Sequence, residues 1–272
     1  HLMRSIAGNK PGSFSKTGLG TFVDPRIDGG KVNEKTTEDL VELIELDGDE
    51  YLRFKPFPIN AAIIRGTTAD TKGNITMEKE CLFIECRTAA MAAKACGGKV
   101  IVQVERLAES GSLPAKEVIV PGILVDYIVV CPREHPEWHM QTYSTQYNPC
   151  YSTELRAPHI TIESLELCAD KIIGRRGVME LEKNYIGNLG IGVPEAVPKI
   201  AAEEGILDWI TFTVEPGPIG GIPAGGLDFG ATTNMEALIQ QPEMFDFYDG
   251  GGLDITYLGL AQIDSNGNNN VS

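Results

Sequence analysis

The 272-residue sequence predicts an α/β fold with two similar α/β domains, each of them incomplete in this chain. One observation is the order of a strand, a tight glycine turn, a helix and a second strand between Gly187 and Val214, which is typical of parallel strands. Another is the apolar, β-branched character of residues 99–105 and 125–131, which is typical of strands buried on both faces. The third is an internal echo, because Asp70-Thr-Lys-Gly-Asn74 recurs as Asp264-Ser-Asn-Gly-Asn268.

The echo extends to the glycine loops that precede its two copies. A loop at Gly18 stands 52 residues before the first copy, and a loop at Gly217 stands 47 residues before the second. Equivalent order at similar spacing predicts a duplication in which the two loops correspond, although a five-residue turn motif alone is a weak signal. Of the two loops, only the one at Gly217 has a glutamate at its head.

The first half of the chain is predicted to begin with a helix and to continue mainly as strands. Residues 1–7 have helical character that ends at Asn9-Lys-Pro-Gly12. A second helix is predicted over 83–96, where an alanine-rich segment runs into Gly97 and Gly98. Strands are predicted over residues 40–46, 51–54, 61–64, 99–105 and 125–131.

The periodicity disappears between Pro132 and Pro158 and returns beyond them. The second half is predicted to form a helix over 163–173, a strand over 187–193, a helix over 194–205 and a strand over 208–214. We therefore expect the C-terminal part of a first domain over 1–140, a linker over 141–165 and the N-terminal part of a second domain over 166–272. Because the sequence opens inside a helix and stops where a strand should start, we expect it to be the middle of a longer polypeptide.

The formal net charge of −15 predicts a protein that binds neither nucleic acid nor anionic membranes, because their phosphate groups would repel it. The sequence has no run of 18 apolar residues and no signal-peptide pattern, so we expect neither a membrane span nor secretion. Six cysteines without a C-x-x-C pair fit the reducing cytoplasm. His135 and His139 are four residues apart, but Pro136 disfavours the helix that would point both at a metal ion, so no metal site is expected.

One carboxylate, Glu215, stands where the strand predicted over 208–214 runs into a loop of glycine and proline. Three glycines of this loop lack the side chains that would keep a ligand from the backbone, and its prolines stiffen it. Those glycines are Gly217, Gly220 and Gly221. The pattern indicates a rigid, open site, whereas the alternative interpretation is an ordinary strand that ends in a surface glutamate and a turn.

The stretch from Thr211 to Gly226, together with Gly225-Gly-Leu-Asp-Phe-Gly230, the run 245–254 and the run 258–268, resembles the family I coenzyme A transferases. The resemblance is greatest to the single-chain propionate or acetate members. In that family a glutamate at the head of a Glu-x-Gly-x-x-Gly-Gly loop is the nucleophile, and the matching residue is Glu215. The family usually has serine after this glutamate, where this chain has Pro216, so any contact of that serine is absent.

A second motif, Asn188-Leu-Gly-Ile-Gly-Val-Pro194, resembles the family segment whose backbone lines the oxyanion site. The resemblance assigns oxyanion or CoA binding to Gly190, Ile191 and Gly192, and points to the amide of Ile191 or Gly192 as the donor. Taken alone, the motif is more typical of a strand-to-helix turn in any α/β fold. It is not a dinucleotide fingerprint, because Pro194 replaces the third glycine.

The resemblance implies that coenzyme A passes between a short-chain acyl-CoA and a carboxylic acid such as acetate or propionate, by a ping-pong mechanism through a glutamyl-CoA thioester. It implies a cytoplasmic homo-oligomer that uses coenzyme A as a substrate and holds no permanent cofactor. Glu105 at a strand end and Asn268 in a turn are weaker substrate-binding candidates, because a surface ion pair is the more common role for the first and a turn role for the second. The alternatives for the whole chain are an acyl-CoA hydrolase on the same scaffold and a catalytically silent fragment.

Overall fold

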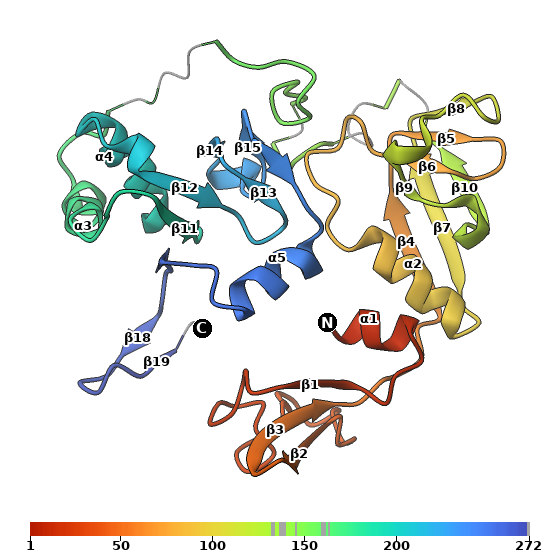
Figure 1. The fold of residues 1–272 in the computed structure, drawn as a ribbon, viewed down its shortest axis with the longest axis horizontal. Coiled ribbons are helices and arrows are strands. Elements are labelled where there is room, and N and C mark those ends of the chain that lie inside the picture. Colours follow the sequence, from red (N-terminus) through yellow and green to blue (C-terminus); the bar gives the residue numbers. More distant parts are fainter. Residues whose placement is uncertain (132–133, 136–139, 145, 159–161, 163, 271–272) are drawn as a thin grey trace. The chain divides into compact units, whose positions relative to one another are not determined.

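The computed structural model describes residues 1–131, 134–135, 140–144, 146–158, 162 and 164–270. The chain divides into two compact units (Figure 1). Unit 1 consists of His1–Thr76 and Cys86–Val130, and unit 2 consists of Met77–Glu85 and Cys131–Ser272. The domain and linker boundaries expected from the sequence at 140 and 165 stay a prediction.

Unit 1 contains a parallel sheet with the order β10-β7-β4, formed by β4 (Ala61–Arg65), β7 (Lys99–Val104) and β10 (Tyr127–Val130). Alternate residues of β7 are buried valines, so one face of this strand lies in the core. Helix α2 (Cys86–Ala95) packs on β4 and β7, and α1 (Leu2–Ala7) packs on α2 (Figure 1). The predicted helix over 83–96 is thus confirmed in its main part, and the strands expected over 99–105 and 125–131 are parallel neighbours.

Two further sheets complete unit 1. The first is mixed, with the order β8-β5-β6-β9. Its strands are β5 (Thr68–Asp70), β6 (Ile75–Thr76), β8 (Arg106–Ala108) and β9 (Val118–Val120), with short 3₁₀ turns η1 (Ala115–Glu117) and η2 (Gly122–Leu124) beside them. The second is antiparallel, with the order β1-β3-β2, and consists of β1 (Ser13–Ser15), β2 (Val41–Leu46) and β3 (Asp49–Phe54).

Unit 2 is built on a five-stranded sheet with the order β16-β13-β12-β11-β17. Its strands are β11 (Tyr185–Leu189), β12 (Ile210–Thr213), β13 (Pro218–Ile219), β16 (Ala237–Leu238) and β17 (Ile255–Tyr257). Strands β12, β11 and β17 are parallel, whereas β13 and β16 are antiparallel to their neighbours. Strand β12 is preceded by η5 (Leu207–Trp209), so the predicted strand over 208–214 begins two residues later than expected.

Helices α3 (Ala169–Val178) and α4 (Ala196–Glu203) pack together and cover this sheet with a core that includes Ile200 and Phe212 (Figure 1). The helix predicted over 163–173 is wrong at both ends, because α3 begins at Ala169 and continues through Gly174 and Gly177. A Cβ at Gly174 would lie 2.6 Å from Cδ1 of Ile200, so this glycine lets the two helices approach closely and does not end the helix.

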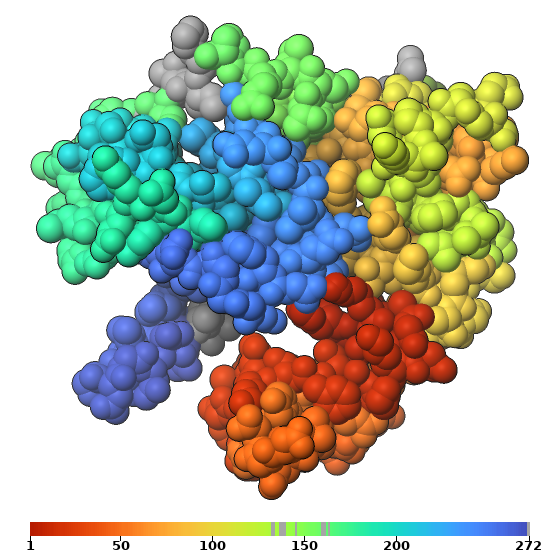
Figure 2. Space-filling model, in the orientation of Figure 1, coloured from red at the N-terminus to blue at the C-terminus, as the bar shows by residue number. Residues whose placement is uncertain are grey.

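The remaining elements of unit 2 are short. They are η4 (Val193–Glu195), β14 (Ile222–Pro223), η6 (Gly226–Asp228), β15 (Thr232–Thr233), α5 (Gln241–Asp249), β18 (Gln262–Ile263) and β19 (Asn269–Asn270). Strands β14 and β15 pair with each other, and so do β18 and β19. The β18–β19 hairpin is exposed along both strands and forms the deep blue lobe of the surface (Figure 2).

The predicted correspondence of the two glycine loops is wrong. Gly18 follows β1, a strand of the antiparallel sheet of unit 1, whereas Gly217 follows the parallel strand β12 of unit 2. The spacing of the loops was similar, but the strands that carry them differ in kind. The internal echo therefore does not extend to these loops.

Within the part of the chain that the structure describes, none of the helices has both the length and the apolar character needed to cross a membrane. None of the six cysteines, all of which are described, forms a disulfide.

Candidate active site

Glu215 lies at the tip of a tight hairpin between β12 and β13. The amide of Val214 donates to the Pro218 carbonyl at 3.0 Å, and the amide of Gly217 donates back to the Val214 carbonyl at 2.9 Å. Val214 is buried, whereas Glu215 is half-buried. The apolar strand therefore anchors the hairpin in the core, and the carboxylate stands beyond the end of the parallel strand β12, as the sequence predicted.

The glycines after Glu215 let unit 2 fold back on itself. A Cβ at Gly217 would overlap the carbonyl oxygen of Ile239, and a Cβ at Gly221 would lie 2.8 Å from the carbonyl carbon of Asn234. At Gly220 the same space is filled by the side chain of Glu236. The space that we expected to admit a ligand at Gly217, Gly220 and Gly221 is thus occupied by the chain itself, and the glycines make the hairpin compact.

The second predicted motif lies at the same edge of the sheet. Strands β11 and β12 are parallel neighbours in which Asn188 pairs with Thr213, so the turn after β11 and the hairpin with Glu215 both follow carboxyl ends of adjacent strands. In open α/β sheets, ligands bind at this edge. The structure therefore places the two stretches singled out in the sequence, 190–192 and 215–221, beyond the same ends of neighbouring strands.

The three amides of the turn at 190–192 differ in their partners. The amide of Gly190 donates to the Tyr257 carbonyl at 2.8 Å, and the amide of Gly192 donates to Oε1 of Glu195 at 3.0 Å. Among the described residues, none accepts a hydrogen bond from the amide of Ile191, whose side chain is exposed. Of the three candidates, Ile191 thus has the backbone donor that remains available to a ligand oxygen.

A buried hydroxyl network lies behind Glu215. The hydroxyl of Tyr248 in α5 donates to Oγ1 of Thr213 at 2.8 Å and lies 3.3 Å from Oδ1 of Asn188, while Thr213 Oγ1 donates to the Gly187 carbonyl at 3.0 Å. Burial raises the pKa of Tyr248 to about 12, and the negative charge of Glu215 acts in the same direction. The phenol is therefore a neutral donor. Sequence reasoning missed Tyr248, because nothing in the 245–254 run distinguishes it from its aromatic neighbours.

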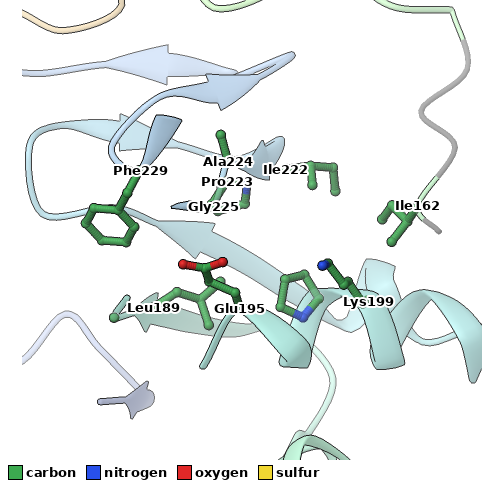
Figure 3. A pocket seen from close by; sticks show the side chains of 11 residues that line it. Ile162, Leu189, Glu195, Lys199, Ile222, Pro223, Ala224, Gly225 and Phe229 are labelled. Atoms are coloured by element: carbon green, nitrogen blue, oxygen red, sulfur yellow. The ribbon is translucent and has the colours of Figure 1, made fainter. Parts of the chain in front are cut away.

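A cavity of about 280 Å³ opens beside the turn at 190–192 (Figure 3). Its walls are mainly apolar, and its polar side chains are those of Glu195 and Lys199. Figure 3 shows the Glu195 carboxylate pointing toward the segment that contains Gly225. Sequence reasoning missed both polar residues. The only signal for Glu195 was its position in the first turn of a helix, which is shared by many surface glutamates.

The two weaker candidates have partners of their own. Glu105, at the end of β7 in unit 1, has Oε2 3.9 Å from the guanidinium of Arg106. Asn268, in the exposed turn between β18 and β19, donates from Nδ2 to Oδ2 of Asp264 at 2.8 Å. Their roles in substrate binding stay predictions.

The part of the chain that is described contains no group of three or more His, Cys, Asp and Glu side chains that could hold a metal ion. Of the histidine pair weighed as metal ligands, His139 lies outside the described residues.

Comparisons with known proteins agree with the resemblance seen in the motifs. Residues 4–131 match the family model described as coenzyme A transferase. The chain is 50% identical over all of its 272 residues to the caffeate CoA-transferase of Acetobacterium woodii, of which it covers 52%. It is 41% identical over 98% of its length to the acetate CoA-transferase YdiF of Escherichia coli strain K12, of which it covers 49%. The chain thus spans about half the length of these curated relatives.

The fold is similar to that of a solved relative. The crystal structure of the apoenzyme of the acyl-CoA transferase YdiF from Escherichia coli O157:H7 superposes with a TM-score of 0.88 at 38% identity, over 99% of this chain and 50% of that one. This match confirms the predicted α/β fold. The chain belongs to the family I coenzyme A transferases.

Proposed function

We propose that the complete protein that contains these 272 residues transfers coenzyme A between an acyl-CoA and a free carboxylic acid, with Glu215 as the nucleophile. The observation that carries the proposal is the position of Glu215 at the tip of the β12–β13 hairpin, beyond the same sheet edge as the available amide of Ile191. A carboxylate that attacks a thioester needs no general base, but the oxyanion that forms needs a fixed donor.

The proposed reaction has two half-reactions of the same kind. Glu215 Oε attacks the thioester carbonyl carbon, the C–S bond breaks, and a mixed anhydride and the CoA thiolate form. The thiolate then attacks the glutamyl carbonyl, which releases the first carboxylic acid as its anion and leaves a glutamyl-CoA thioester. The second carboxylate reverses these steps and leaves as the new acyl-CoA. The Ile191 amide would stabilise each oxyanion, and no permanent cofactor is needed.

The acids that we propose are short-chain carboxylates, with acetate and propionate first. Support comes from the relative named for acetate, while the relative named for caffeate extends the proposal to a larger, aromatic acid. A panel of acetate, propionate and caffeate as acceptors, with one acyl-CoA donor, ranks them by kcat/KM. We further propose that the protein works in the cytoplasm as a homo-oligomer, which sedimentation of the complete protein would test.

The decisive experiment follows Glu215 itself. The complete protein is mixed with propionyl-CoA, digested, and the peptides that cover Thr211 to Gly226 are analysed by mass spectrometry. A CoA adduct on Glu215 is expected, and borohydride should reduce the activated glutamyl carbonyl.

Substitutions then separate the candidate functions. Glu215→Gln keeps the shape of the side chain without the anionic nucleophile, so it should still bind acyl-CoA and lose the bulk of its turnover. Glu215→Asp withdraws the carboxylate by about one methylene, a displacement that near-attack geometry does not tolerate. Glu166→Gln, an exposed carboxylate in the same unit, is the matched control. Release of CoA without an added acid would indicate a hydrolase, and no adduct at all would indicate a silent chain. Near-normal exchange by Glu215→Gln, with no deamidation, would move the search for the nucleophile to Glu105.

A further inference from the structure

The carboxylate of Glu195 connects two glycine segments that are far apart in the sequence. Its Oε1 atom accepts from the amide of Gly192 at 3.0 Å and from the amide of Gly226 at 3.2 Å. The first contact is a capping interaction, because Gly192 is the N-cap of η4 and Glu195 is its third residue. The second contact is not part of any helix cap of η4, since Gly226 lies 31 residues further along the chain.

The neighbouring residue, Gly225, leaves its side-chain space to this carboxylate. A Cβ at Gly225 would lie 2.7 Å from Cδ of Glu195 and closer still to its Oε2, and the three atoms nearest to it all belong to Glu195. The backbone of Gly225 is extended, with φ −111° and ψ 177°, so alanine fits there without backbone strain. Figure 3 shows the carboxylate directed at this segment.

The amide of Ile191 lies between two amides that are held in place. Gly190 is bonded to the Tyr257 carbonyl on one side, and Gly192 is bonded to Glu195 on the other. Gly192 has φ +86°. Because a glycine without contacts adopts positive and negative φ about equally, a hydrogen-bond partner is needed to hold this conformation. Glu195 supplies that partner and is itself fixed by Gly226.

We infer that Glu195 is a positioning residue that orients the Ile191 amide toward the oxyanion, an inference that rests on the proposed function of Glu215 and Ile191. An oxyanion donor acts only at hydrogen-bond distance from the developing charge, and a misplacement of about 1 Å can lower the rate by about 10²-fold. Loss of the Glu195 carboxylate releases Gly192 and lets the turn sample other conformations. Binding of acyl-CoA in the ground state depends on other contacts, so its affinity is affected less than the rate.

Four variants of the complete protein test this inference: Glu195→Ala, Glu195→Gln, Gly225→Ala and the double variant Glu195→Ala/Gly225→Ala. The readouts are the single-turnover rate of adduct formation at Glu215, the KM for propionyl-CoA and the thermal midpoint. Glu243→Ala is the matched control, because Glu243 Oε2 accepts from the Gln240 amide at 2.9 Å in the capping box of α5, and that contact lies within one helix start.

Glu195→Ala should slow adduct formation by about 10²-fold with a KM changed by less than about threefold. Glu195→Gln keeps an oxygen acceptor for both amides and should restore most of the rate. Gly225→Ala should slow the reaction because its methyl group displaces the carboxylate, yet it should add little in the Glu195→Ala background, where nothing is left to displace. Glu243→Ala should lower the thermal midpoint and leave the rate near that of the wild type.

Several results would overturn the inference. An unchanged adduct rate in Glu195→Ala would do so, and so would a Gly225→Ala effect of equal size with and without Glu195. If Glu243→Ala lowered the rate as much as Glu195→Ala, the loss of any helix cap would explain the effect, and Glu195 would have no positioning role. A different result, CoA transfer by Glu215→Gln, would refute the proposed function. When Glu215→Gln abolishes the adduct and Glu195→Ala does not slow it, only the positioning role is refuted.

Discussion

Replacement of Gly217 by alanine tests whether the hairpin that carries Glu215 is rigid. Gly217 has φ +131°, a conformation that side-chain-bearing residues adopt only under strain, which costs about 1–3 kcal/mol. The new methyl group would overlap the Ile239 carbonyl oxygen, and this oxygen would have to retreat by about 1 Å. The same movement stretches the hydrogen bond from the Ile239 amide to the Gly217 carbonyl, now 3.1 Å long, which contributes about 1 kcal/mol.

Together these effects predict a loss of about 3 kcal/mol or more in the free energy of unfolding of unit 2. Gly205→Ala is the matched control, because Gly205 has φ +71° with no atom within 4 Å of the added methyl group, and it should lose only about 1 kcal/mol. Urea unfolding followed by tryptophan fluorescence measures both variants. Trp209 lies in unit 2, so its fluorescence follows the unfolding of this unit.

The rate of adduct formation at Glu215 should fall in Gly217→Ala, because the displaced hairpin moves the carboxylate, and should be unchanged in Gly205→Ala. If Gly217→Ala unfolded at the same urea concentration as Gly205→Ala, the hairpin would be free to relax and the rigidity argued from its contacts would be refuted.

Three further predictions concern acid stability, the hydroxyl network and the core of unit 2. The ion pair with Lys171, with help from the Leu165 amide, lowers the pKa of Glu203 to about 2. The Glu203 carboxylate therefore stabilises unit 2 fully above the ordinary glutamate pKa of 4.5, and this stabilisation disappears as the pH falls toward 2. Acid unfolding of Glu203→Gln should lack that part of the transition. Tyr248→Phe should lower the free energy of unfolding of unit 2 by about 1–2 kcal/mol in urea, because a hydrogen bond to Thr213 is lost. Its pH–rate profile should keep its shape below pH 10, since the phenol is neutral there, and a shift of either limb of that profile would contradict this. Ile200→Ala should cost about 2–5 kcal/mol, whereas Ile172→Ala, at an exposed position of α3, should cost less than about 0.5 kcal/mol.

Local sequence patterns predicted some strand limits well, but the strand expected over 187–193 is β11 (Tyr185–Leu189), which ends four residues earlier than expected. The β-branched run before Glu215 and the apolar run of β7 both form strands within two residues of the expected limits. Each run is short, continuous and rich in β-branched residues. The resemblance of the Glu215 loop and of the turn at 190–192 to a known family added the roles of these residues.

Contacts between distant segments could not be predicted in the same way. The expected end of a helix before Gly174 failed because the reason for this glycine is Ile200 of another helix. The space above Gly217 was assigned to a ligand because nothing in the sequence reveals that Ile239 fills it. The bond from Gly226 to Glu195 is equally invisible, since it spans 31 residues without a shared motif. A glycine in a sequence shows that a side chain is absent, and only the fold shows what takes its place.

The structure shows how far the two copies of the internal echo, 70–74 and 264–268, correspond. Asp264 follows Asp70 by 194 positions, and the first residue of β17 follows the first residue of β4 by the same 194. In both turns the aspartate accepts from the amides two and four residues ahead, and from the side chain of the asparagine, at 2.8–2.9 Å. The paired strands are in equivalent register, because Thr68 pairs with Thr76 as Gln262 pairs with Asn270.

The matching segment is therefore a strand followed by an antiparallel hairpin with an aspartate-centred turn. The same offset would place the counterpart of Glu215 at Thr21, in a turn beyond the antiparallel strand β1, where no parallel strand leads into it. A nucleophile at that position would lack the hairpin and the neighbouring strand end that position Glu215. The echo thus relates the β4 and β17 segments, and the arrangement around Glu215 has no equivalent in the described part of unit 1.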